Sequence, residues 1–153
     1  MLFLYPGLLL LVAGVLGVAV LLPGPIMIGG VTFDIHTFTM SCLLVLLGTQ
    51  AIQFAVTARR FAVSQKLMPP PRWYLSFFKG ITLERVLVGA AILLVLGAVG
   101  IAYAFVEWVF AGFGPLNYPS LLRILILSAT AIAIGMQSAF IAFLSAIMEV
   151  PTK

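Results

Sequence analysis

Charged side chains are scarce in this sequence. Only 8% of its 153 residues are charged, whereas 63% are hydrophobic. A soluble domain carries about 25% charged residues, which are needed to cover its surface. The composition therefore excludes a water-soluble globule and indicates an integral membrane protein.

Long stretches of the chain contain no charge at all, and four apolar runs are each long enough to cross a bilayer. A helix of about 20 residues spans a hydrocarbon core about 30 Å thick and satisfies its own backbone hydrogen bonds there. The first run has no Lys or Arg and is too long for a cleaved signal peptide, so a retained anchor is favoured. We predict an all-α integral membrane bundle of four transmembrane helices in one domain, 1–153, with helices at about 2–22, 36–57, 86–110 and 121–147.

Acids, histidine and cysteine are also few, which excludes several kinds of site. The chain has four acids and one histidine, and no two acids are close in sequence. It therefore lacks a D-x-D metal motif, a Cys/His zinc site and a phosphate-binding glycine loop. We expect no metal and no cofactor; the alternative that His36 ligates a chlorin is disfavoured, because a lone interfacial histidine is usually capped or solvated. Cys42 is expected to be a buried thiol rather than part of an intermolecular disulfide.

The positive charge is concentrated in one segment. Six of the eight Lys and Arg residues lie at 58–85, and the connections 23–35 and 111–120 have none. By the positive-inside rule, 58–85 is a cytoplasmic loop and both termini are cytoplasmic. Because the cations follow membrane topology, they do not indicate a nucleic-acid partner.

The second half of this loop is rich in aromatic residues. Met68-Pro69-Pro70-Pro71 cannot be helical, and Trp73, Tyr74, Phe77 and Phe78 follow it at helical spacing. We predict a short interfacial helix that lies on anionic lipid; an ordinary aromatic belt is the alternative. The candidate residues for binding lipid or a partner protein are Arg59, Arg60, Arg72, Trp73, Lys79 and Arg85.

A second group of polar residues is predicted at the outer face. The topology places Asp34, His36, Glu107 and Arg123 at the same depth. Charges at membrane depth are costly unless paired, so we expect a Glu107–Arg123 ion pair with Asp34 and His36 nearby. The cluster is either a pocket for a lipid phosphate or sugar, or a structural pair with Asp34 capping its helix.

The remaining polar side chains lie within the predicted helices, where they indicate contacts between helices rather than a transport path. Interhelical hydrogen bonds are expected from Gln50 and Gln53 of the second helix to Thr130, Gln137 and Ser138 of the fourth. This is too little polarity at the midplane for a transporter or channel. Small residues at Ala131, Gly135 and Ala139 would let another helix approach the fourth closely. We find no internal repeat.

Several short phrases, in order along residues 3–147, resemble a known family. They are Phe3-Leu4-Tyr5-Pro6-Gly7, Gly29-Gly30-Val31-Thr32-Phe33-Asp34-Ile35-His36-Thr37, Leu47-Gly48-Thr49-Gln50, Thr82-Leu83-Glu84-Arg85, Gly112-Phe113-Gly114-Pro115-Leu116 and Gly135-Met136-Gln137-Ser138. Together they resemble the C-terminal membrane module of bacterial family 2 glycosyltransferases, the dolichyl-phosphate-mannose-synthase-like enzymes. In that family a separate cytoplasmic domain binds the nucleotide sugar, and the module anchors it beside a polyprenyl phosphate acceptor.

The resemblance implies a role without catalysis. Because the chain begins with Met1 just before the module, we expect no catalytic domain and no catalytic residues. We expect a membrane subunit that docks to other membrane proteins and to lipid. Two alternatives stay open: an accessory structural subunit of a larger complex, for instance photosynthetic or respiratory, or a partner that presents polyprenyl phosphate to a separate glycosyltransferase.

Overall fold

The computed structural model describes residues 3–65, 83–112 and 118–148, apart from the side chains of residues 118 and 119. Its elements are α1 (Leu4–Leu21), β1 (Ile26–Ile28), β2 (Val31–Phe33), α2 (Ile35–Ser64), α4 (Leu83–Phe110) and α5 (Tyr118–Met148). All four described helices are long and apolar enough to cross a membrane. The prediction of an all-α bundle with four such helices is confirmed. The predicted interfacial helix lies outside the described residues.

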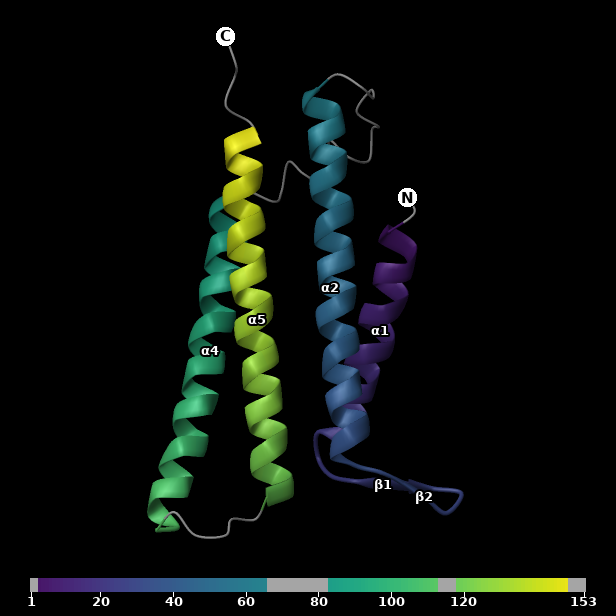
Figure 1. Ribbon diagram of the computed structural model, residues 1–153, viewed down its shortest axis with the longest axis vertical. Coiled ribbons are helices and arrows are strands. Elements are labelled where there is room, and N and C mark those ends of the chain that lie inside the picture. The colour runs from purple at the N-terminus through teal and green to yellow at the C-terminus, as the bar shows by residue number, and fades with distance from the viewer. Residues whose placement is uncertain (1–2, 66–82, 113–117, 149–153) are drawn as a thin grey trace.

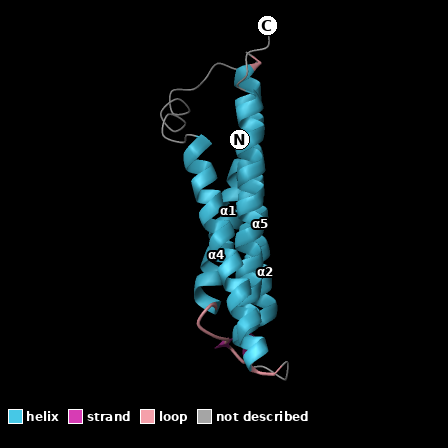
Figure 2. Ribbon diagram, turned by 90° about the vertical axis from the view of Figure 1, so that its left-hand side faces the viewer, coloured by secondary structure: helices cyan, strands magenta, loops and turns pink. Residues whose placement is uncertain are grey.

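The helices form two antiparallel hairpins placed side by side. α1 packs against α2, and α4 packs against α5, while α2 and α5 meet between them (Figure 1). In a view turned by 90° the helices still run along one common axis (Figure 2). We call the contact between α2 and α5 the seam. We call the end of the bundle at Ser64 and Leu83 the cationic end, and the end at β1 and β2 the hairpin end.

The predicted bounds of three helices are close to the observed bounds, whereas the predicted second helix is shorter than α2. The sequence predicted an end near residue 57, but α2 continues to Ser64 and carries Arg59 and Arg60 on its last two turns. That part of the predicted 58–85 loop is therefore helical. Residues 58–64 include no proline or glycine, and a helix keeps its own hydrogen bonds on leaving the hydrocarbon, so nothing ends it at the membrane boundary.

The connection between α1 and α2 is a small β-hairpin. β1 and β2 pair antiparallel with Ile28 opposite Val31, so only Gly29 and Gly30 make the turn. Their φ angles are +58° and +83°, and a two-residue hairpin turn of this kind requires positive φ at both positions, which favours glycine.

The two hairpins repeat the same packing, so the expectation of no internal repeat is wrong. The buried residues of α1 are at 7, 14 and 21; adding 83 gives 90, 97 and 104, the buried residues of α4. Similarly, adding 87 to the buried positions 41 and 48 of α2 gives 128 and 135, which are buried in α5. The repeated residues include Gly14 and Gly97, Gly17 and Gly100, Ser41 and Ser128, and Gly48 and Gly135.

Equivalent glycines meet equivalent atoms. A Cβ added at Gly14 would lie 2.7 Å from the carbonyl oxygen of Ser41, and one at Gly97 would lie 2.7 Å from that of Ser128. A Cβ at Gly135 would lie 2.9 Å from the carbonyl oxygen of Ala90, so the predicted close approach at Gly135 is confirmed, with α4 as the approaching helix. In each hairpin, therefore, the absence of a side chain lets two backbones come together, as is typical of packing in lipid.

Candidate functional site

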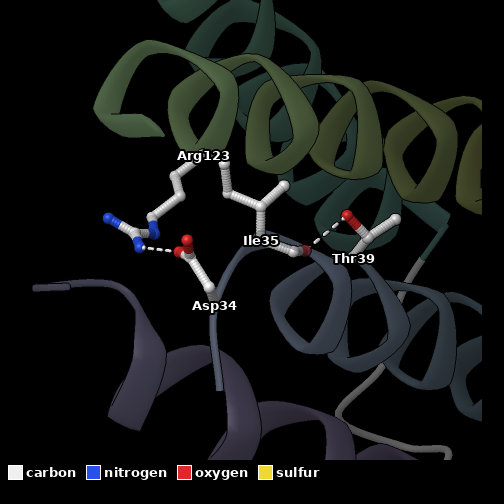
Figure 3. A network of polar contacts seen from close by, with 4 residues as sticks. All are labelled: Asp34, Ile35, Thr39 and Arg123. Carbon is white, nitrogen blue, oxygen red and sulfur yellow. Dashed lines mark hydrogen bonds and ion pairs between the residues drawn. The ribbon is translucent and has the colours of Figure 1, made fainter. Parts of the chain in front are cut away.

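A buried ion pair joins the two hairpins at the hairpin end of the seam. Nη2 of Arg123 on α5 donates to Oδ1 of Asp34 at a distance of 2.6 Å (Figure 3). The Arg123 side chain is 7% exposed and that of Asp34 is 44% exposed. Asp34 stands at the position preceding α2, yet its side chain makes no capping hydrogen bond. The carboxylate therefore neutralises a buried cation instead of capping its own helix.

The predicted partner of Arg123 was wrong. Within the described part of the chain, Arg123 pairs with Asp34 rather than with Glu107. The reason is the face of α5 that carries Arg123: α5 packs against both α4 and α2, and Arg123 lies on the side that meets the start of α2. His36 is exposed, since it lies about 200° around the helix from position 34.

Polar contacts continue along the seam toward the cationic end. Cys42 is buried on α2, as predicted. Farther along, Nε2 of Gln53 donates to Oγ of Ser138 at 2.7 Å. The expected hydrogen bond between α2 and α5 is thus confirmed for Gln53, whereas Gln50 is exposed.

Several buried polar atoms at this end of the seam have no hydrogen-bond partner within residues 3–65, 83–112 and 118–148. They are Oε1 of Gln53, Oγ1 of Thr57 and Oε1 of Gln137. We call Gln53, Thr57, Gln137 and Ser138 the inner seam cluster. Thr57 was missed at the sequence level, because a threonine in a helix usually bonds to the carbonyl four residues earlier and gives no signal of another role.

The predicted lipid- or partner-binding residues are placed only in part. Arg59 and Arg60 lie on α2 and are half-buried, and Arg85 lies exposed on the first turn of α4, so all three are at the cationic end. Arg72, Trp73 and Lys79 lie outside the described residues. Whether these side chains act together stays a prediction.

No group of three His, Cys, Asp or Glu side chains that could hold a metal ion is found among the residues placed by the structure. The ionisable groups Arg123 and Asp34 instead form an ion pair. What the described side chains can do is neutralise charge in the bilayer, join helices and offer hydrogen-bond acceptors at one end of the seam.

Comparison with known proteins places the chain in a family. No curated protein and no solved structure matches it. One family does match, over residues 56–149, which is more than half of the chain and covers the end of α2, the loop that follows, α4 and α5. The phrases before residue 56 that resemble the family lie outside this match. The chain belongs to the family described as the glycosyltransferase family 2 C-terminal transmembrane region.

Proposed function

We propose that the chain is a non-catalytic membrane subunit that docks to a partner protein and to lipid. The observation that carries the proposal is that the family match covers a transmembrane region and that the described residues form four long apolar helices. Such a module can position a partner at the membrane, and its described polar side chains are used for packing between helices.

The partner that fits best is a separately encoded cytoplasmic glycosyltransferase. Family membership supports this choice, because the matched region is by its description the membrane part of such enzymes. Arg59, Arg60 and Arg85 gather at one end of the bundle, where cations attract anionic head groups. Under this proposal the cationic end faces the cytoplasm of a bacterial inner membrane and lies beside the polyprenyl phosphate acceptor.

The proposal is tested by purification in mild detergent. We expect a glycosyltransferase catalytic subunit to co-elute with the chain. The purified chain alone should transfer no sugar from a nucleotide donor to polyprenyl phosphate, whereas adding back the co-eluting subunit should give transfer. Turnover by the chain alone, free of contaminating transferase, would falsify the non-catalytic role. Co-elution with a photosynthetic or respiratory complex would instead support the accessory structural subunit.

A further inference from the structure

The inner seam cluster lies about one bilayer thickness from the hairpin end of the bundle. Counted from Ile35 at about 1.5 Å per residue, Gln53 is about 27 Å along α2, and counted from Tyr118, Ser138 is about 30 Å along α5. The hydrocarbon core is about 30 Å thick. A core that begins at the starts of α2 and α5 would therefore end near the cluster, and we infer that the cluster meets the head groups on the cationic end.

Three acceptor atoms of the cluster have no hydrogen-bond partner among the described residues. Thr39, Ser41, Thr49 and Thr130 each donate to the carbonyl four residues earlier. Thr57 does not: its Oγ1 is buried without a partner, like Oε1 of Gln53. A buried polar atom without a hydrogen bond costs free energy, and most at membrane depth. Such atoms indicate a ligand that supplies donors.

The second hairpin acts as an internal control. Adding 87 to 53 and 57 gives positions 140 and 144, which are Phe140 and Leu144, both exposed. That hairpin makes the same glycine contacts as the first without polar groups at these positions. Packing within a hairpin therefore does not require Gln53 or Thr57, and their polarity serves the seam itself.

We propose that the inner seam cluster binds the head group of a phospholipid that carries a hydrogen-bond donor beyond its phosphate. The donor is an ethanolamine ammonium or a glycerol hydroxyl, and it meets the acceptor atoms of Gln53, Thr57 and Gln137. Arg59 and Arg60 follow Thr57 within one turn of α2, on the side where the phosphate would lie. This deepens the lipid-binding part of the proposed function and rests on it, but needs no partner protein.

The test measures lipid retained by the full chain. The purified protein is exchanged into detergent containing equal amounts of phosphatidylethanolamine, phosphatidylglycerol and phosphatidylcholine, whose choline has no donor, and is examined by native mass spectrometry. We expect several-fold enrichment of at least one donor-bearing lipid over phosphatidylcholine. Thr57→Val, which keeps the side-chain shape, and Gln53→Leu should each lower the enrichment. The matched control is Gln50→Leu, an exposed glutamine on the same helix, which should leave it unchanged.

Each outcome of this experiment either supports or contradicts the proposed lipid binding. Enrichment of phosphatidylethanolamine alone identifies the ammonium as the donor, and enrichment of phosphatidylglycerol alone identifies the hydroxyl. Equal retention of all three lipids by the unaltered chain would mean that water satisfies the acceptors, and the proposal is then wrong. It is also wrong if Thr57→Val keeps the full enrichment, or if Gln50→Leu loses as much. Circular dichroism checks helix content, and if Gln53→Leu does not fold, Thr57→Val decides. Because the chain is tested alone, failure here leaves the docking role untouched.

Discussion

Arg123 illustrates how one residue can be located from sequence while its contact cannot. The topology placed Arg123 and Asp34 at the same depth, and the structure confirms that they meet. The choice of partner was wrong because depth follows from position along each helix, whereas contact also depends on the direction in which a side chain faces. α5 packs against both α4 and α2, and Arg123 lies on the side toward α2. Hydropathy alone does not give that direction.

The ion pair between Arg123 and Asp34 predicts a specific pattern of stability. Asp34→Ala leaves a buried cation without its carboxylate, and we expect a loss of about 1–3 kcal/mol, the usual cost of an unsatisfied buried group. Arg123→Leu removes the cation and should cost less, because an apolar side chain in the seam needs no carboxylate to neutralise it. Unfolding in mixed detergent micelles measures both variants.

The double variant and a control at a neighbouring position test whether the ion pair itself causes these losses of stability. On the Arg123→Leu background, Asp34→Ala should cost little, because no buried cation remains to be neutralised. His36→Ala changes an exposed side chain close to Asp34 and should leave stability almost unchanged. If the costs of Asp34→Ala and Arg123→Leu simply add, the pair makes no contribution and the buried-pair argument fails.

At the scale of helices and hairpins, the sequence correctly predicted that four long helices exist, but the repeat that relates the two helical hairpins was missed. Apolar length alone predicted four helices, because backbone hydrogen bonding in lipid leaves few alternatives. The repeat was not visible because it rests on a few glycines and serines in a background rich in leucine and valine. Its offset also changes from 83 between α1 and α4 to 87 between α2 and α5, because 31 residues separate positions 97 and 128 but only 27 separate positions 14 and 41.

The repeated glycines predict equal effects in the two hairpins. An added Cβ would lie 2.6 Å from the backbone nitrogen of Val45 in Gly14→Ala, and 2.7 Å from the carbonyl oxygen of Ser128 in Gly97→Ala. Backbone cannot move aside without shifting a helix, so each variant should lose about 1–3 kcal/mol. Thermal unfolding in detergent, read by circular dichroism, compares them.

Gly89 provides the matched control for this comparison. It also lies on α4, but a Cβ added there would meet nothing within 4 Å. Gly89→Ala should therefore be neutral or stabilise by up to about 1 kcal/mol through helix propensity. A result in which Gly97→Ala is no worse than Gly89→Ala would show that close backbone contact does not hold α4 to α5.

At the scale of the whole molecule, the seam separates two kinds of packing. Within each hairpin, glycines bring backbones together at equivalent positions. Across the seam, Asp34 meets Arg123 and Gln53 meets Ser138, and the positions equivalent to these residues are not partners of one another. The repeat thus builds two similar units, and non-repeated polar side chains fix how they join. Polar contacts of this kind are specific to one pairing, because an unmatched polar group in lipid is costly.

The orientation of the molecule in the membrane is predicted by charge and can be tested directly. Arg59, Arg60 and Arg85 lie at the cationic end, so this end should remain in the cytoplasm and the β-hairpin should lie outside. In a Cys42→Ser background, Ser64→Cys and Thr32→Cys place single thiols at exposed positions on opposite ends of the bundle. A membrane-impermeant thiol reagent added to intact cells should label Thr32→Cys only, and Ser64→Cys should react only after the membrane is opened. Labelling of Ser64→Cys in intact cells would reverse the topology and remove the basis for placing a cytoplasmic partner at the cationic end.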